Sequence, residues 1–561
     1  MLIILISWCY IFMTLINFGF LARSVFKFSV VNALVQLVLG LISLLIIGHI
    51  WAFFLGFGVL FHVLLLFSNA IISWRFRKEI TEFFKSTTQQ IFAFSASYKI
   101  LLAVIFLLIL AKSAAQGSRL DNENYYIQTI KWLNEFGFVN GLANLHLFFG
   151  QTSGWHILQS MFSFEFLNIP LNDLGSLLLL ILNIYALKIL NQKNANDLLW
   201  GLPIFNFLLL EFTIIPSPDF GIIFFALIAF YVFLKSYKTP RLTDFYLVLL
   251  CVLSALLIKV TAIGLFVLPV VLLFKLKKLS FRIWVKLFSV VIFFLMLLIA
   301  KNLIISGYPF FPSEILSEYI SYKHKIPEEL YNFLLRREML YEFFASVEQV
   351  RTSSDFELFW QWLTRSKISL IFNASLLLSV LVIPLVFLKY RLKTKYWWIY
   401  ISFLCQLFFL ALTSPQYRFA IHYLIFFSLL FFHITVQKQS FRFSILGISQ
   451  FLTLYFLIFP IRFDQLSSYE FQFNSSDLKI KNVFYPAPNS SLQTKYTNQK
   501  IGNTNYNIPQ EKVYFWSNGD CELPCVNNIQ LKFIYNKTNL YPQLIDTTSL
   551  KKGFYSEKYI R

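Results

Sequence analysis

Charged residues are scarce in this sequence, and acidic residues are scarcer than basic ones. Only 14% of the 561 residues are charged, with 28 Asp and Glu against 48 Lys and Arg, while 57% are hydrophobic. A typical soluble domain is only roughly half apolar. The composition therefore excludes an ordinary soluble protein, which could not bury this much apolar surface, and predicts an integral membrane protein.

Cysteine is also rare, with five in the chain. Cys9, Cys251 and Cys405 lie in apolar segments, where packing is the usual role of a cysteine. Cys521 and Cys525 lie in a polar tail, and no His/Cys set with zinc spacing accompanies them. If the tail is outside the cytoplasm, we expect these two to form a small local disulfide; a metal-binding pair is the alternative.

The motifs of soluble nucleotide-using enzymes are missing from the sequence. It shows no phosphate-binding glycine loop, zinc motif or Ser/His/Asp signature, so a soluble nucleotide-sugar site is not expected. The net charge of +20 would point to nucleic acid in a soluble protein. Here most of the excess lies in short loops, where it orients the chain and meets anionic lipid headgroups, so no nucleic-acid partner is predicted.

The sequence is rich in long apolar segments, of which about fourteen between Met1 and Ile461 could span hydrocarbon. Basic residues gather in the short loops at every second junction, and basic short loops stay in the cytoplasm. The N-terminus and the remaining junctions, with the long loops 116–170 and 306–366, are therefore predicted to face outward. The basic loop residues are Arg23, Lys27, Arg75, Arg77, Lys78, Lys188, Lys193, Lys235, Lys238, Arg241, Lys275, Lys277, Lys278, Lys389, Arg391, Lys393, Lys395, Lys438 and Arg442.

The composition changes at Arg462 to a tail rich in Asn, Ser, Lys and Tyr. Alternating runs such as Lys512 to Trp516 predict strands, and about a hundred residues suffice for a small domain. The number of spans places this tail outside with the N-terminus. The predicted fold is thus an all-α polytopic membrane domain, residues 1–461, followed by a small C-terminal extracytoplasmic domain with strands, residues 462–561.

The first long outer loop has its own helical pattern and a candidate catalytic acid. Asn122 to Phe136 is predicted to be an amphipathic helix, and Trp155 to Phe166 a short interfacial or re-entrant helix. Asp121 or Glu123 could take a proton from an attacking hydroxyl, although an acid at position 121 could equally cap the following helix. Asp219, at an outward turn between two spans, has the same two interpretations.

Cations stand at the same outward ends of the spans. Lys259 and the pair Lys301 and Asn302 could either extend to lipid headgroups or bind an anionic ligand. Arg418 could clamp a phosphate, because its planar fork matches phosphate oxygens, and His422 shares its helix face. Tyr308 belongs to an aromatic, proline-rich turn beyond Asn302. Acids and cations on one side suit an anionic, lipid-linked substrate.

Several short stretches spread over most of the chain carry a resemblance to a known class of enzymes. They are Asp121 through Tyr125-Tyr126, Gly141-Leu142-Ala143-Asn144-Leu145-His146, Pro216-Ser217-Pro218-Asp219, Ser306-Gly307-Tyr308-Pro309, Arg418-Phe419-Ala420 and Leu523-Pro524-Cys525. With the many spans, the long first outer loop and the tail, the chain resembles the GT-C class of integral-membrane glycosyltransferases, and more closely an uncharacterised bacterial family of polytopic membrane proteins related to it. Tyr126 stands where the closer family would have His.

The resemblance implies transfer of a sugar from a polyprenyl-phosphate donor to an envelope glycan, lipid or protein, on the outer side of a bacterial cytoplasmic membrane. Asp121 inherits the role of catalytic base, with Glu123 as second choice and Asp219 as orienting acid. No cofactor is required by the sequence, and a divalent metal at Asp219 is left open. The alternatives are a transporter or flippase, or a polymerase partner, for lipid-linked saccharides. The residues expected to bind substrate are Tyr125, Tyr126, Asn144, His146, Lys259, Lys301, Asn302, Tyr308, Arg418 and His422.

Overall fold

The computed structural model describes residues 1–28, 32–117, 119–192, 197–276, 279–335, 346–466, 478–492, 495–510 and 517–558. The run Lys512 to Trp516, predicted to be a strand, lies outside these residues. So do the loop lysines Lys193, Lys277 and Lys278.

The chain is a mostly helical, multi-pass membrane protein. Within the described ranges, nine helices are long and apolar enough to cross a membrane, or ten if α3 and α4, bent by 86° at their junction, form one span. Four shorter apolar helical segments accompany them, from Leu174, Leu198, Leu242 and Val260 onward. The predicted helical class is therefore confirmed. The count of fourteen spans stays a prediction, because four of the segments fall short of the length that a span needs.

The membrane part consists of these elements: α1 (Leu2–Phe26), α2 (Ala33–Phe54), α3 (Val59–Arg75), α4 (Arg77–Phe92), α5 (Ala96–Ser113), α8 (Leu174–Leu190), η5 (Leu198–Phe205), α9 (Asn206–Thr213), α10 (Pro218–Ser236), α11 (Leu242–Ile258), η6 (Val260–Phe266), α12 (Val267–Lys275), α13 (Phe281–Ser306), α18 (Ile368–Lys389), α19 (Thr394–Leu412), η8 (Tyr417–Ala420), α20 (Ile421–Thr435) and α21 (Gln439–Ile458). The short helix α22 (Phe463–Leu466) follows them at the start of the tail.

Helix α10 forms the centre of this bundle, as its nearly complete burial shows. It begins sharply, because Pro218 occupies its first turn and the Ser217 hydroxyl accepts a hydrogen bond from the Asp219 amide. By contrast, α13 and α18 bury only a few of their apolar side chains, as expected for helices that face lipid. The first turn of α10 therefore carries Asp219 into the middle of the molecule.

Helices α1 and α2 approach each other closely through glycine. A side chain at Gly19 would overlap the backbone of Gln36, and one at Gly40 would overlap the backbone of Leu15. Small residues allow such close helix packing in membranes, where van der Waals contact rather than the hydrophobic effect holds helices together.

The first long loop, residues 116–170 and called the first outer loop after its predicted side, folds into short helices that are mostly buried, except for the last of them. The predicted amphipathic helix is present, but it opens with one π-helical turn before the α-helix begins. The predicted helix from Trp155 is shorter than expected, ending at Ser160 and followed by a separate turn. The loop elements are η1 (Asn122–Tyr126), α6 (Ile127–Glu135), η2 (Leu142–Asn144), η3 (Leu147–Gln151), α7 (Gly154–Ser160) and η4 (Glu165–Leu167).

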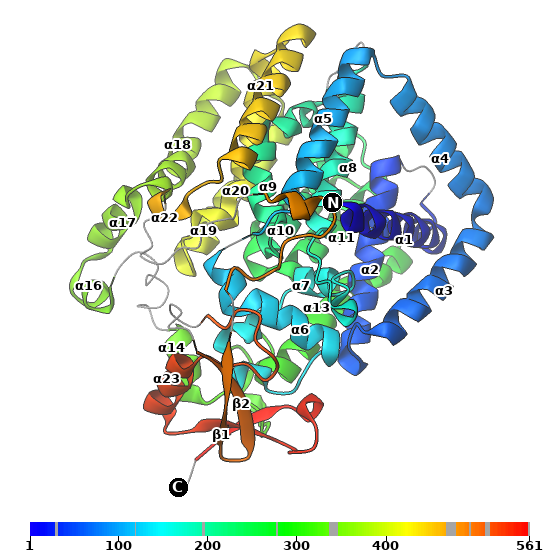
Figure 1. Ribbon diagram of the computed structural model, residues 1–561. Coiled ribbons are helices and arrows are strands. Elements are labelled where there is room, and N and C mark those ends of the chain that lie inside the picture. Colours follow the sequence, from blue (N-terminus) through cyan, green and yellow to red (C-terminus); the bar gives the residue numbers. More distant parts are fainter. Residues whose placement is uncertain are drawn as a thin grey trace.

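The second long loop, residues 306–366 and called the second outer loop after its predicted side, carries short helices. They are η7 (Ser317–Tyr319), α14 (Glu328–Leu335), α16 (Val347–Thr352) and α17 (Asp355–Thr364). Figure 1 shows α14 next to α23 of the tail, at one end of the molecule, while α5 and α21 extend toward the opposite end.

The tail contains strands, as predicted, arranged as two separate antiparallel pairs. Tyr496 pairs with Pro509 in the first, and Tyr541 with Glu557 in the second. The tail elements are η9 (Ile480–Val483), β1 (Tyr496–Ile501), β2 (Thr504–Pro509), α23 (Asn528–Thr538), β3 (Tyr541–Leu544), η10 (Leu550–Lys552) and β4 (Phe554–Glu557).

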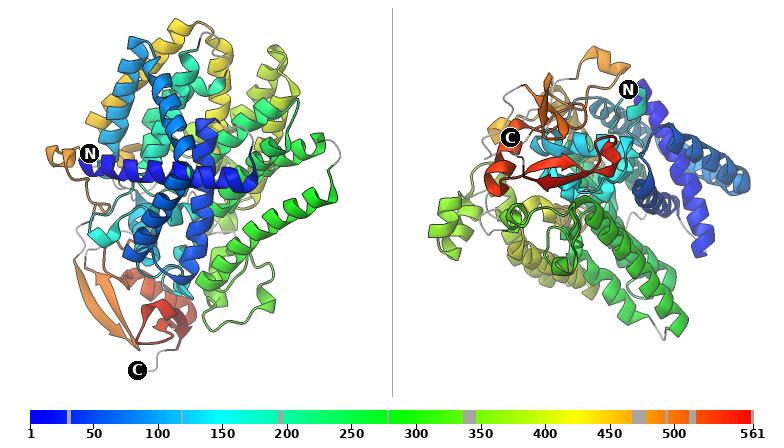
Figure 2. Two further views of the ribbon diagram at one scale, coloured as in Figure 1. Left: turned by 90° about the vertical axis from the view of Figure 1, so that its right-hand side faces the viewer. Right: turned by 90° about the horizontal axis from the view of Figure 1, so that it is seen from below.

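The tail rests on the first outer loop along its length (Figure 2). The Gln128 side chain donates hydrogen bonds to the backbone of Gly519 and Cys521, and the Phe554 amide donates to the Asn140 carbonyl at 2.8 Å. Loop and tail therefore form one layer over the end of the bundle where Asp219 lies.

Candidate functional site

Two carboxylates and two cations from four distant segments meet above the first turn of α10. Arg418 Nη1 donates a hydrogen bond to Asp121 Oδ2 at 2.6 Å, and Arg418 Nε lies 4.0 Å from Asp219 Oδ2. Lys259 Nζ lies 3.2 Å from Asp219 Oδ1. Asp121, Asp219, Lys259 and Arg418, four of the candidate site residues named from the sequence, are thus brought together.

Local breaks in helical structure deliver the two cations. Lys259 is extended, with φ −160° and ψ 120°, between the end of α11 and the start of η6. Arg418 lies in the 3₁₀ turn η8, where its Nε also donates to Gln416 Oε1 at 2.8 Å. The Phe419 ring lies under both cations, with Lys259 Nζ 3.6 Å and Arg418 Cζ 5.2 Å from its centre. Such cation–π contacts hold the cations in place without neutralising them.

The site is partly open on the side of Asp121 and Arg418. Their side chains are 26% and 32% exposed, whereas that of Asp219 is 3% exposed. Burial would raise the pKa of the Asp121 carboxyl, but the charge and hydrogen bond of Arg418, with Lys259 and Arg119, outweigh it and hold this pKa below its usual range. Asp121 is therefore a carboxylate at neutral pH and the accessible acid of the group.

Aromatic side chains line the wall beside Asp121. The Tyr126 hydroxyl donates to Asp121 Oδ2 at 3.5 Å, and the Tyr125 ring packs edge-on against the Tyr126 ring. The His156 ring lies 4.8 Å from the Tyr126 ring, centre to centre. Burial lowers the pKa of His156 to about 3, so the imidazole is neutral.

Two residues of this neighbourhood were missed by the sequence reasoning. Arg119 contributes positive charge at Asp121, and its guanidinium lies 4.9 Å from the Phe212 ring centre. Its position two residues before Asp121, on the predicted outer side, was the available signal. His156 had no comparable signal, because its approach to Tyr126 depends on how α7 folds back against η1.

Glu123, the second choice for the base, points away from Asp121 and holds the tail. Its carboxylate accepts hydrogen bonds from the Ser490 hydroxyl at 2.7 Å and from the Ser491 amide at 2.9 Å. Burial raises the pKa of this carboxyl, against the lowering effect of those hydrogen bonds. Its geometry is that of a structural anchor between loop and tail.

Three other predicted binding residues, Asn144, Asn302 and Tyr308, make structural contacts within and between the two long loops. Asn144 Nδ2 donates to the His324 carbonyl at 2.9 Å, and Asn302 Nδ2 donates to the Pro309 carbonyl at 3.1 Å. Tyr308 stacks on Tyr331 with ring centres 3.8 Å apart. Asn144 thus ties the second outer loop to the first loop, and Asn302 ties it to α13, whereas the Tyr308 stacking lies within the second loop.

His146, Lys301 and His422 are buried away from the four charges. His146 Nδ1 accepts a hydrogen bond from the Phe148 amide at 3.2 Å, and Lys301 Nζ donates to the Thr152 carbonyl. His422 stacks on Phe230 inside the bundle.

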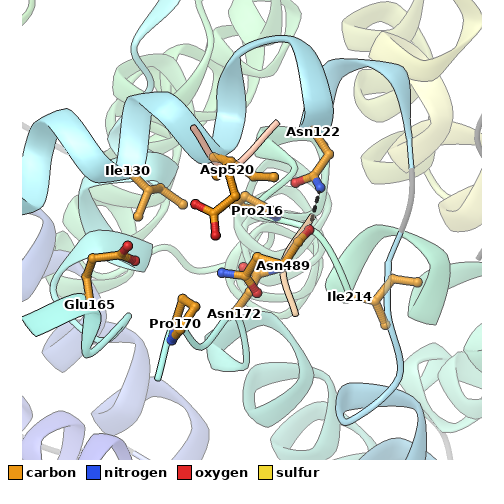
Figure 3. Close-up of a pocket in the computed structure, with 10 residues that line it drawn as sticks. Asn122, Ile130, Glu165, Pro170, Asn172, Ile214, Pro216, Asn489 and Asp520 are labelled. Atoms are coloured by element: carbon orange, nitrogen blue, oxygen red, sulfur yellow. Dashed lines mark hydrogen bonds between the residues drawn. The ribbon is translucent and has the colours of Figure 1, made fainter. Parts of the chain in front are cut away.

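A separate polar pocket lies beside η1, between the first loop and the tail. Asn122 donates a hydrogen bond to the Asn489 carbonyl at 2.9 Å, and the carboxylates of Glu165 and Asp520 point into the pocket (Figure 3). Lys131 forms an ion pair with Asp520 at 2.7 Å. The remaining lining residues are Ile127, Ile130, Pro170, Asn172, Ile214 and Pro216.

The acids of the site have cations rather than further ligands as neighbours. Over the ranges that the structure describes, no three His, Cys, Asp or Glu residues form a cluster able to hold a metal ion.

Cys521 and Cys525 are joined in a disulfide, which closes the turn that Gln128 contacts. The predicted metal alternative for these cysteines is therefore wrong.

Comparison with known proteins identifies the family but no activity. No curated protein and no solved structure matches this chain. One family model, described as a domain of unknown function, DUF8201, matches residues 1–425, which include Asp121, Asp219, Lys259 and Arg418. The chain therefore belongs to the DUF8201 family.

Proposed function

We propose that this protein is a GT-C-like membrane glycosyltransferase that transfers a sugar from a polyprenyl-phosphate donor to an envelope glycan, lipid or protein acceptor. The observation that carries the proposal is the meeting of Asp121, Asp219, Lys259 and Arg418 in one partly open group. A base can take the proton of an attacking hydroxyl, and nearby cations can stabilise a departing phosphate, so the group suits glycosyl transfer from a lipid phosphate.

In the proposed reaction, the acceptor oxygen attacks the anomeric carbon of the donor, whose bond to the phosphate oxygen breaks. Asp121 accepts the proton of the acceptor hydroxyl, and Arg418, Lys259 and Arg119 stabilise the phosphate that leaves with the bonding electrons. When the phosphate engages Arg418, Asp121 loses part of the interaction that lowers its pKa, so it becomes a stronger base once donor is bound.

The proposal includes the arrangement of the chain in the membrane. The apolar segments form fourteen spans of a bacterial cytoplasmic membrane, with the basic loops inside and the N-terminus, both long loops and the tail outside. The four charges then lie at the outer ends of spans, in reach of a lipid-linked donor and of acceptors in the envelope. Asp219, paired with Lys259, orients the sugar or Arg418.

The test is a transfer assay with the full-length protein in liposomes. Radiolabelled polyprenyl-phosphate sugars are supplied with envelope acceptors, and labelled product is measured. Asp121→Asn is expected to reduce transfer by about 10²–10⁴-fold, the usual contribution of a general base, without loss of expression or donor binding. Glu318→Gln, an exposed acid of the second outer loop, serves as the control and keeps full activity. Undiminished transfer by Asp121→Asn would remove Asp121 as the base.

A transporter for lipid-linked saccharides is the second candidate, and one observation favours it. Apolar helices are interrupted at both cations, at Lys259 between α11 and η6 and at Arg418 between α19 and α20. Interrupted helices build substrate sites in many secondary transporters. Movement of a fluorescent lipid-linked sugar across liposomes, with no transfer product, would support transport and contradict the glycosyltransferase.

A further inference from the structure

A short segment of the tail, Ile480 to Tyr485, presents apolar side chains to the surroundings. Ile480 is 88% exposed, Phe484 60% and Tyr485 66%, and Val483 is exposed beside them. Single exposed apolar residues are ordinary on protein surfaces, but four within six residues form an apolar patch of the kind that marks a contact with a protein or a membrane. We call these four residues the apolar wedge.

The wedge is attached to the ends of two candidate membrane spans. The amino group of Met1, at the start of α1, donates a hydrogen bond to the Asn482 carbonyl at 2.7 Å. The Ala487 amide donates to the Ala114 carbonyl, one residue beyond the end of α5, at 3.0 Å. Figure 1 shows the N-terminus beside this part of the tail. Because span ends lie at the boundary between lipid and water, the wedge lies at that depth too.

The wedge is held in one conformation with its apolar side chains outward. Asn482 is the buried residue of this turn; its side chain accepts a hydrogen bond from the Lys479 amide at 2.8 Å and donates to the Tyr485 carbonyl at 3.3 Å. With Asn482 turned inward, the side chains on either side of it point away from the protein. The exposure is therefore a property of the fold of this turn.

The chemistry around the wedge matches a membrane interface. Lys479 and Lys481 are exposed on the same turn, where they can meet anionic lipid headgroups. Tyr is enriched at membrane–water interfaces, and Phe is common on the apolar face of segments that lie in the interface. On α1, Leu2 and Ile6 are also exposed and continue the apolar surface from Met1 along the first two turns.

We propose that the apolar wedge inserts into the headgroup and acyl-chain boundary of the bilayer and thereby anchors the tail to the membrane surface. The partner is a phospholipid bilayer containing anionic lipid, and the two lysines strengthen the attachment. The anchor keeps the layer formed by the tail and the first outer loop at a fixed height above the bundle. This proposal is independent of any enzymatic activity.

Spin labelling of the full-length protein tests the insertion. Cys9, Cys251 and Cys405 are replaced by Ser, the Cys521–Cys525 disulfide is kept oxidised, and one label is attached to Phe484→Cys in liposomes of zwitterionic and anionic phospholipid. Ile292→Cys on α13 provides the hydrocarbon reference and Gln499→Cys on β1 the aqueous one; both residues are exposed. Collisions with dissolved oxygen and with a water-soluble nickel chelate are then compared.

The expected oxygen-to-nickel collision ratio at position 484 is severalfold higher than at position 499 and approaches that at position 292. A ratio equal to that at 499 would show the wedge in water and overturn the proposal. A label shielded from both reagents would show a protein partner instead and also overturn it. When anionic lipid is omitted, the ratio at position 484 should fall, and it should fall less in the Lys479→Gln/Lys481→Gln variant than in the protein that keeps both lysines. An equal fall in the two proteins would overturn the role of the lysines.

Discussion

Arg418 and Asp121 form an ion pair at 2.6 Å although 297 residues separate them. One belongs to a turn that begins a late helix of the bundle, the other to the first outer loop. The pair joins loop and bundle, and it brings a carboxylate and a guanidinium to the same partly open group.

The ion pair predicts a specific dependence of stability on pH. The pKa of Asp121 is lower in the folded protein than in the unfolded one, so its contribution to stability is present above the unfolded value and lost as pH falls through the folded value. The difference in thermal unfolding temperature between wild type and Asp121→Asn should therefore shrink as pH falls below about 4, near the usual carboxyl pKa.

Removal of the guanidinium should shift that titration. In Arg418→Gln, burial of Asp121 continues to raise its pKa while the largest opposing effect is gone. The pH below which Asp121 stops contributing to stability should rise relative to wild type. The same unfolding series, recorded for Arg418→Gln and for its double variant with Asp121→Asn, measures the shift. An unchanged pH dependence would show that the two side chains do not interact in the membrane.

A second ion pair tests the packing of the bundle rather than the site. Lys112 on α5 and Glu211 on α9 lie 2.7 Å apart, with side chains 5% and 3% exposed. Lys112→Met leaves a buried carboxylate without its partner and should cost about 3–5 kcal/mol. Lys112→Met/Glu211→Leu should recover most of this loss. The exposed Arg241–Asp244 pair is the control, and Arg241→Met should cost at most about 1 kcal/mol. Equal losses in both single variants would contradict the buried pair.

Glu123 is predicted to matter for attachment of the tail. Glu123→Ala removes the acceptor of hydrogen bonds from Ser490 and Ser491 and should weaken their docking by about 1–3 kcal/mol. Limited proteolysis should then cut the segment 478–492 faster than in wild type. The control is Glu348→Ala, at an exposed acid in α16, in which the protease should cut this segment at the wild-type rate. Resistance of Glu123→Ala equal to that of the control would show that Glu123 does not hold the tail.

Much of the architecture could be predicted because it follows from apolar runs and local patterns. The helical membrane class and the strands in the tail depend on composition and periodicity. The number of spans could not be fixed in this way, because segments such as Leu174–Leu190 are shorter than a usual span and hydropathy alone cannot separate a short span from a buried helix.

The candidate site was predictable in part for a different reason. Asp121, Asp219 and Arg418 could be grouped because the charge pattern of the loops assigned them to one side of the membrane. The side of the membrane on which a loop lies follows from the order of spans and basic loops along the sequence, without knowledge of the three-dimensional fold. The distances between these three residues, and the roles of Glu123 and Asn144 in holding tail and loops, depend on side chains far apart in sequence. The sequence gives no pattern for such contacts, so His156 beside Tyr126 could not be anticipated.

Cross-linking tests directly whether the first outer loop and the turn before α20 share one centre on the outer side of the membrane. Asp121→Cys and Arg418→Cys are combined after replacement of Cys9, Cys251 and Cys405 by Ser, and intact cells are treated with a short, membrane-impermeant bifunctional thiol reagent. If the two residues meet on the outer side, positions 121 and 418 are cross-linked without permeabilisation. Labelling of the two positions from opposite sides of the membrane, or no cross-link when both react from outside, would contradict it.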